Sequence, residues 1–285
     1  MNPPPVGISI ITSSRWGDVD RTLSMIAKWP EFEDSHVIVL DDGSAEPVPA
    51  GLAKRFPGVW FIESRRSLGV PEQRTRIARL LDTEFVLQLD ENSYPVEGSV
   101  SEAVSFLRGR ADIVALALNV VQGAMAQPSF DTDAPPHQVE MFIGCGVLLR
   151  RERFLELGGY IGALGCDSEE RHFCARAIRE GQAIYKFPSL VIRHEQPSSA
   201  RSLAKIAFYK GRNRVLLVLW NYPIAAVPFR LATSLPGTLA LVRPRDYPAA
   251  IAGFFAGLYD GIRMLGQRRP LSLKQYHWWR HLPSF

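Results

Sequence analysis

Cysteine is scarce in this sequence of 285 residues, and its three cysteines, Cys145, Cys166 and Cys174, form no C-x-x-C pair. An odd number without that spacing argues against a disulfide framework and against a thiolate zinc site, and it fits a reducing cytoplasm. The N-terminus, MNPPPVGISIITSS, lacks a basic segment followed by a long apolar one, so we expect no secretory signal there.

Several common motifs are also missing. No G-x-G-x-x-G follows the first apolar run, and neither G-x-x-x-x-G-K-[ST] nor G-x-S-x-G occurs. Dinucleotide sites, P-loops and the nucleophile elbow of hydrolases are therefore unsupported. The longest apolar stretches, VLLVLWNYPIAAVPF and YPAAIAGFFAGLYDGIRML, are interrupted by polar residues or proline. Neither reaches the roughly 18–20 unbroken apolar residues that a membrane span needs.

The charge is unevenly distributed. The net charge is +4, but residues 201–285 carry +11 and residues 1–200 carry −7. We therefore predict two regions, a domain over 1–200 and a basic, aromatic-rich helical region over 201–285. The basic region either lies on an anionic membrane or packs its apolar faces on the main domain. No nucleic-acid reading motif accompanies the basic residues, so we predict no nucleic-acid partner.

Residues 1–200 alternate between strand-like and helix-like segments, most clearly in the first half. The strand-like runs are VGISIIT, HVIVLDD, GVWFIES and EFVLQLD, and the helix-like runs are DVDRTLSMIAKW, GLAKRF and GVPEQRTRIARLL. Alternation of this kind predicts an α/β fold, with a mainly parallel sheet that is covered by helices on both faces.

Acidic residues end two of these strand-like runs, at Asp41–Asp42 and at Asp90–Glu91. In a parallel sheet both pairs lie at the same carboxyl edge, where open α/β sheets bind ligands. Carboxylates without a glycine-rich phosphate cradle favour phosphate binding through a hard divalent cation, Mg²⁺ or Mn²⁺.

An ordered set of segments resembles glycosyltransferase family 2. The segments are VIVLDDGS, SLGVPEQRTRIA, LQLDEN, FIGCGVLLRRERFLELGGY, SEERHFCARAIREG and VIRH, and the resemblance covers about residues 6–195. It implies a GT-A-type fold, a UDP-, GDP- or TDP-linked sugar donor, a divalent cation and transfer with inversion at the anomeric carbon.

The resemblance also implies roles for individual residues. Gly69 and Arg74 match the family's G-x-x-x-x-R element, and Asp90-Glu91-Asn92 matches its D-x-D, with Asn92 departing from that pattern. The implied nucleotide-binding residues are Thr12, Ser13, Asp41, Asp42, Arg74 and Asp90. The implied metal ligands are Asp90, Glu91, Asn92 and His194.

The stretch GCDSEERHFCARA matches the region of the family's catalytic base. By this match Glu170 is the base, Glu169 is its partner, and Gly144, Gly146 and Arg176 lie near the donor or acceptor. An inverting transfer needs one carboxylate to take the proton from the acceptor hydroxyl.

The stretch FYKGRNRVLLVLWNYP is similar to the tails of membrane-associated members of the family. This similarity implies a cytoplasmic enzyme on the inner face of the cell membrane, with a saccharide or lipid-linked acceptor in cell-surface polysaccharide or glycolipid biosynthesis. Two alternatives remain open, a nucleotidyltransferase and a catalytically silent module that binds sugar nucleotides or lipids. Loss of turnover in Glu170→Gln with donor affinity kept distinguishes an enzyme from a silent module.

Overall fold

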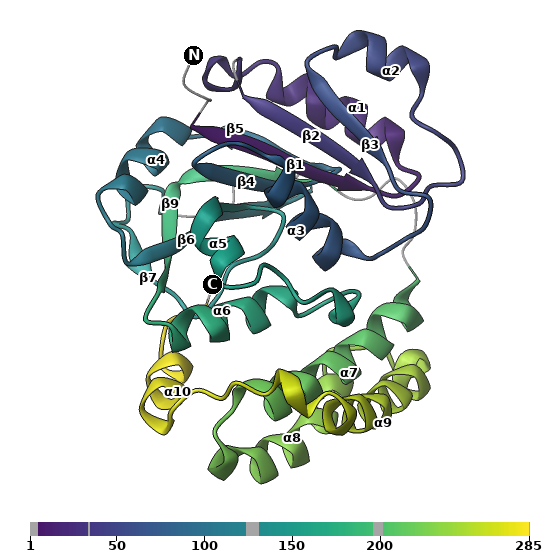
Figure 1. Cartoon of the computed structure of the whole chain (residues 1–285), viewed down its shortest axis with the longest axis vertical. Helices are drawn as coiled ribbons and strands as arrows, with labels where there is room; N and C mark the ends of the chain where they lie inside the picture. Colours follow the sequence, from purple (N-terminus) through teal and green to yellow (C-terminus); the bar gives the residue numbers. More distant parts are fainter. Residues whose placement is uncertain (1–4, 34, 124–130, 196–201, 285) are drawn as a thin grey trace.

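The computed structural model describes residues 5–33, 35–123, 131–195 and 202–284, and within these residues nine strands form one sheet (Figure 1). The strand order is β3-β2-β1-β4-β8-β6-β9-β5, with β7 beside β9. The strands are β1 (Val6–Thr12), β2 (His36–Asp41), β3 (Val59–Glu63), β4 (Phe85–Asp90), β5 (Ser93–Glu97), β6 (Ile113–Gln122), β7 (His137–Gln138), β8 (Val147–Arg150) and β9 (Ala183–His194).

The first half of the sheet is parallel, as the alternation of strand and helix predicts. Strands β1 to β4 run in one direction, and β6 runs parallel to β9. Strand β8 is antiparallel to both β4 and β6, while β5 and β7 are antiparallel to β9. The predicted α/β class with mainly parallel strands is confirmed, and the carboxyl ends of β1, β2 and β4 share one edge.

Helices cover both faces of the sheet and continue beyond it. The predicted helical runs after β1, β2 and β3 form α1, α2 and α3. Pro71 lies in the first turn of α3, where a backbone N–H would have no acceptor within the helix, so proline is tolerated there. The helices are α1 (Trp16–Ile26), α2 (Ala50–Arg55), α3 (Val70–Leu80), α4 (Val100–Arg108), α5 (Arg151–Glu156), α6 (Glu169–Arg179), α7 (Leu203–Asn221), α8 (Val227–Leu239), α9 (Tyr247–Arg263) and α10 (Leu273–Arg280).

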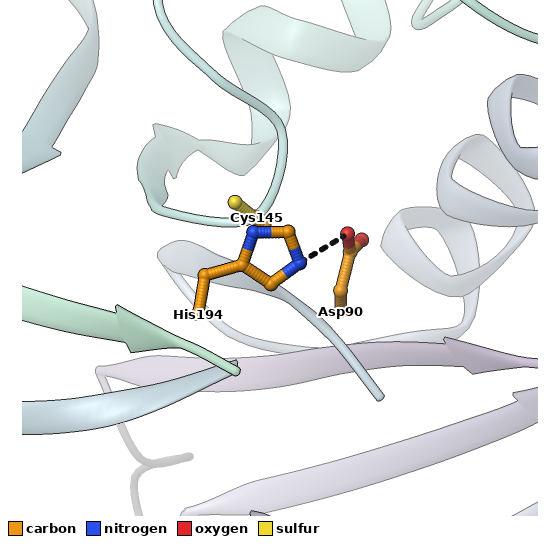
Figure 2. Close-up of side chains that lie close together, drawn as sticks. All are labelled: Asp90, Cys145 and His194. Carbon is orange, nitrogen blue, oxygen red and sulfur yellow. Dashed lines mark ion pairs between the residues drawn. The ribbon is translucent and has the colours of Figure 1, made fainter. Parts of the chain in front are cut away.

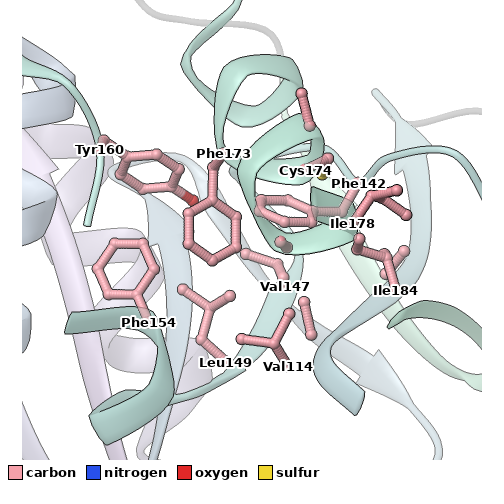
Figure 3. Close-up of a cluster of buried hydrophobic side chains, with 14 of the residues drawn as sticks. Val114, Phe142, Val147, Leu149, Phe154, Tyr160, Phe173, Cys174, Ile178 and Ile184 are labelled. Carbon is pink, nitrogen blue, oxygen red and sulfur yellow. The ribbon is translucent and has the colours of Figure 1, made fainter. Parts of the chain in front are cut away.

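Each face of the sheet has its own apolar core, because successive side chains of a strand point to opposite faces. Leu87 and Leu89 of β4 pack with residues of α1 and α4, whereas Val86 packs with α3, α5 and α6. The second core contains a group of aromatic rings that includes Phe154 and Phe173, which lie 5.0 Å apart between centroids (Figure 3). This core anchors α6 on the sheet.

Residues of the basic region form a helical layer that packs on α6 (Figure 1). His172 of α6 is fully buried, and its two ring nitrogens lie 3.2 Å from the Asn213 carbonyl oxygen and 3.0 Å from Asn221 Nδ2, both on α7. Burial lowers the pKa of His172 to about 3, so the ring is neutral. Trp279 of α10 is also fully buried and donates to the Glu140 carbonyl at 2.7 Å.

Within this layer, α7 and α9 pack closely through glycines. Gly253 and Gly257 on one face of α9 touch the backbone of α7, where an added Cβ would lie 2.0 Å from the Phe208 carbonyl oxygen and 2.6 Å from that of Arg212. Packing of the basic region on the main domain is therefore observed. The domain boundary predicted between residues 200 and 201 lies outside the described residues. No helix among the described residues is long and apolar enough to cross a bilayer.

Candidate active site

A cleft of about 970 Å³ opens at the carboxyl edge of the sheet and extends to the helical layer. One end is lined by residues that end or follow β1, β4 and β9, and the other by residues of α7 and α8. The N-terminus of α6 lies along it, with Glu169 and Glu170 among the lining residues. The cleft therefore joins the acidic strand ends predicted from the sequence to the basic region.

Arg74 of α3 connects the acidic groups of this cleft. Its buried guanidinium lies 2.7 Å from Asp90 Oδ1, and its other terminal nitrogen lies 3.5 Å from both Glu169 Oε1 and Glu170 Oε1. Burial by itself disfavours this charge, but Asp90, then Glu169 and Glu170, outweigh it and raise the pKa of Arg74. Arg74 is therefore a permanent cation between the strand end of β4 and the first turn of α6.

The glutamate pair differs in exposure. Glu169 is buried, whereas the Glu170 side chain is partly exposed to the cleft. Burial, followed by the charge of Glu170, raises the pKa of Glu169 to about 8. Burial also raises the pKa of Glu170, although Arg74 opposes the shift. Gly144 donates its N–H to Glu170 Oε1 at 3.1 Å, so the backbone fixes this carboxylate.

The chain reaches this pair through a strained loop. Gly165, Asp167 and Ser168 all have positive φ, of 69°, 65° and 69°, a region that side chains disfavour. Asn213 of α7 holds the loop, because its fully buried amide donates to the carbonyls of Leu164, Cys166 and Asp167 at 3.0, 2.6 and 2.8 Å. A residue of the basic region thus positions the loop that leads to Glu169 and Glu170, a role that the sequence did not indicate.

Asp90, Cys145 and His194 form a group that fits a metal ion (Figure 2). Each offers one ligand atom, these atoms all lie within 4.8 Å of one another, and His194 Nε2 is 3.7 Å from Asp90 Oδ2. The imidazole and the thiol suit a borderline cation such as Zn²⁺, whereas the carboxylate also suits Mn²⁺ or Mg²⁺. Burial, then Asp90, raises the pKa of the Cys145 thiol. The sequence predicted Asp90 and His194 as ligands but missed Cys145, which belongs to a distant loop.

The other two predicted ligands, Glu91 and Asn92, contact other residues of the protein. The Glu91 carboxylate lines the cleft but makes an ion pair with Arg15, another lining residue that the sequence analysis left without a role. Asn92 does not line the cleft, and its side-chain amide donates to the Glu195 carbonyl at 2.6 Å.

The acidic turn after β2 accepts hydrogen bonds from the loop that leads into α3. Asp42 lines the cleft, and its carboxylate accepts hydrogen bonds from four groups, among them Gln73 Nε2 and the Leu68 N–H, both at 2.7 Å. Asp41 does not line the cleft and accepts hydrogen bonds from the backbone and hydroxyl of Ser44. Nucleotide binding by either aspartate stays a prediction.

Of the remaining predicted site residues, some line the cleft and others lie outside it. Thr12 and Ser13 line the cleft, and the buried Thr12 hydroxyl has no hydrogen-bond partner among the described residues. Gly146 packs on Val120 instead of lining the cleft. Arg176 also lies away from the cleft, where it donates to the Leu157 and Gly159 carbonyls at 2.6 and 2.5 Å and supports the end of α5. Gly69 and Gly144, in contrast, do line the cleft.

No family model and no curated protein matches the sequence. Solved structures do match. GalNAc-T7 with UDP, GalNAc and Mn²⁺ is 16% identical, with a TM-score of 0.64 over 99% of this chain and 58% of that one. The mannosyltransferase PcManGT from Pyrobaculum calidifontis, in complex with GDP-Man and Mn²⁺, is 17% identical with a TM-score of 0.60, over 97% of this chain and 83% of that one. S. aureus TarS 1–349 with UDP-GlcNAc is 14% identical with a TM-score of 0.60, over 91% and 81%.

The chain has the GT-A fold. The fold that the resemblance implies is thereby confirmed, while membership of family 2 stays a prediction. This chain spans only 58% of the GalNAc-T7 chain, and identities of this size establish the fold alone. Function on a GT-A fold must therefore be argued from the cleft itself.

Proposed function

We propose that this protein is a metal-dependent inverting glycosyltransferase that moves a sugar from a UDP-, GDP- or TDP-linked donor to a saccharide or lipid-linked acceptor. The observation that carries the proposal is the arrangement in one cleft of Glu170 and of the metal-binding group Asp90, Cys145 and His194, linked through Arg74. The GT-A likeness supports it, because the similar structures hold UDP, GDP-Man or UDP-GlcNAc.

The donor fits the end of the cleft at the sheet edge. Thr12, Ser13 and Asp42 line the part of the cleft where the nucleoside lies in this proposal. Asp90 and His194, with Cys145, would hold a divalent cation. When bound, such a cation offsets the negative charge that develops on a departing nucleoside diphosphate.

Glu170 is the general base in this proposal. As the acceptor oxygen bonds to the anomeric carbon, its proton passes to the Glu170 carboxylate. The bond between that carbon and the diphosphate oxygen breaks on the opposite face, so the electron pair leaves with the diphosphate and the configuration inverts. The Glu170 side chain is the more exposed of the two, which favours Glu170 as the base, whereas burial and the charge of Glu170 raise the pKa of Glu169.

Nucleotide-sugar binding gives the first test. Purified protein is heated with UDP-, GDP- and TDP-sugars, each with and without Mn²⁺, and the unfolding midpoint is recorded. We expect one nucleotide class to raise the midpoint in a metal-dependent manner. Absence of any shift, in a protein that unfolds cooperatively, contradicts the proposal.

Turnover gives the second test. In Glu170→Gln the donor should still raise the unfolding midpoint, while transfer falls by 10²-fold or more, since general base catalysis contributes typically that much. Unchanged donor binding without turnover in the wild-type protein would favour the silent sugar-nucleotide module, and release of diphosphate from a nucleoside triphosphate would favour a nucleotidyltransferase.

The proposal includes peripheral contact with an anionic membrane, on the inner face of the cell membrane. Arg243 and Arg245 precede α9 and Arg263 ends it. Basic residues beside an exposed apolar stripe fit an interface that contains anionic lipids. The stripe runs along α9 opposite its glycines, with side chains that are 38% to 66% exposed, at Ile251, Phe255, Tyr259 and Ile262.

Vesicle sedimentation tests the membrane contact. Phe255→Ser combined with Ile262→Ser should reduce binding to vesicles that contain phosphatidylglycerol. Trp60→Ser is the matched control, because Trp60 is 63% exposed but belongs to β3. Equal binding of the wild-type protein and the double variant would remove the membrane from the proposal and leave a saccharide acceptor in solution.

A further inference from the structure

The cleft has a second, strongly basic end beyond Glu170. Arg171, Arg214, Arg230 and Arg280 all line it, and they come from α6, α7, α8 and α10 respectively. Burial lowers the pKa of Arg214, and the positive charges of Arg171, Arg280 and Arg230 lower it further. Four guanidinium groups from four helices therefore face one another in a space that also contains Tyr222.

The described residues supply little negative charge to this group. Glu140 lies 2.9 Å from Arg171 Nη2 and 3.7 Å from Arg280 Nη1. Arg230 donates to the Tyr276 hydroxyl at 2.5 Å, which is a neutral partner. Within the described part of the chain, Arg214 has no carboxylate within ion-pair distance. One carboxylate against four guanidinium groups leaves a surplus of positive charge in the cleft.

Arg214 of α7 lies close against the backbone of α8. Its guanidinium lies over Gly237 of α8, where an added Cβ would be 2.5 Å from Nη2. Bulk at position 237 would displace Arg214 from the cleft. The guanidinium fork binds phosphate through paired charge-assisted hydrogen bonds, which a lysine at the same position would not reproduce.

We propose that this basic end is the acceptor subsite and that it binds a phosphate or diphosphate group carried by the acceptor. The inference rests on the proposed function and adds to it the chemical class of the acceptor. The donor diphosphate is assigned to the other end, where Arg74 and the metal-binding group lie. Arg171 follows Glu170 in the chain, so an acceptor held by its phosphate presents a nearby hydroxyl to the base.

Binding of inorganic phosphate to the full chain is the first measurement. We expect the double variant Arg214→Gln, Arg230→Gln to bind phosphate about tenfold or more weakly than the wild-type protein, since each charge-assisted hydrogen bond contributes substantially. Arg263→Gln is the matched control, because Arg263 belongs to the basic region but does not line the cleft. Equal phosphate affinity in the wild-type protein and the double variant overturns the proposal.

Competition separates this inference from the proposed function. Nucleotide-sugar with Mn²⁺ should raise the unfolding midpoint of the double variant as much as that of the wild-type protein, and it should not displace phosphate. Displacement of phosphate by the donor would assign the arginines to the donor diphosphate and overturn the acceptor subsite. If the donor does not bind even the wild-type protein, the proposed function is wrong.

Two further competitors identify the source of the phosphate. Vesicles that contain phosphatidic acid test a lipid-borne phosphate, with phosphatidylcholine vesicles as the control. Glucose 6-phosphate, with glucose as the control, tests a phosphorylated saccharide in solution. Displacement of inorganic phosphate by either phosphate-bearing competitor supports the subsite and names the source. If neither competes, the basic end does not bind phosphate esters and the proposal is wrong.

Discussion

Arg74 lies 2.7 Å from Asp90 and 3.5 Å from both Glu169 and Glu170, so one guanidinium joins the end of β4, with its candidate metal ligand, to the helix that carries the glutamate pair. The guanidinium is buried, so its removal leaves Asp90 and Glu170 without the cation that they share, beside the buried Glu169. Breaking a buried cluster of this kind is costly, because the remaining charges stay out of water.

We therefore predict that Arg74→Met lowers the free energy of unfolding by about 3–5 kcal/mol. Urea unfolding checks this value. Arg79→Met on the same helix is the control, because its side chain is 60% exposed and should change the stability by less than about 1 kcal/mol. Similar stabilities for the two variants would show that Arg74 does not balance the buried acidic groups.

Stability should fall as the pH rises from about 5 to about 8. Burial raises the pKa of Glu169 from 4.5 to about 8, so the native state holds a proton that the unfolded chain has already released. The stabilisation is complete below the unfolded pKa and is lost as the pH rises through the folded one. Urea unfolding across this range should show a flatter profile in Glu169→Gln than in the wild-type protein or in Glu180→Gln.

Cys145→Ser should change the metal preference of the cleft. A thiol favours softer cations, so the variant should lose affinity for Zn²⁺ and Co²⁺ more than for Mn²⁺. The intense near-ultraviolet absorption of a cobalt–thiolate bond is the direct readout. Cys166→Ser is the control, since Cys166 lines the cleft outside the metal-binding group. A cobalt spectrum that is unchanged in Cys145→Ser would contradict ligation by this thiol.

Gly257→Ala and Gly51→Ala should have opposite effects. Alanine stabilises an unhindered helix by up to about 1 kcal/mol relative to glycine, and a Cβ at position 51 meets nothing within 4 Å. At position 257 the same Cβ would lie 2.6 Å from the Arg212 carbonyl, so α7 and α9 must separate. We expect a loss of about 1–3 kcal/mol there, measured by thermal unfolding. A rise in both midpoints would refute the close packing.

The parallel half of the sheet could be predicted from the alternation of apolar strand-like runs and helix-like runs. The apolar runs that became β1, β2 and β4 each bury a continuous stretch, and the acids at the ends of β2 and β4 indicated the edge at which the cleft opens. Asp90 faces the cleft as predicted. Glu91 also lines the cleft but pairs with Arg15, whereas Asn92 lies outside the lining and donates to the Glu195 carbonyl, because successive side chains at a strand end point in different directions.

The rest of the site depends on contacts between distant segments. Cys145 reaches Asp90 only because β8 pairs with β4 and brings the preceding loop to the sheet edge. In the sequence Asn213 is an ordinary polar residue of a helix, but in the structure its amide donates to three carbonyls of the loop that precedes α6. Pairings of this kind leave no local pattern in the sequence.

Asn213 and Arg214 are neighbours on α7, one holding the loop of the glutamates and the other lining the basic end of the cleft. A tilt or slide of α7 would therefore disturb the loop that precedes α6 whenever it reshaped that end. Arg230 on α8 and Arg280 on α10 face the same space without holding the loop. Under the proposed function, acceptor preference can therefore change by replacement of these two side chains while α7 stays in place.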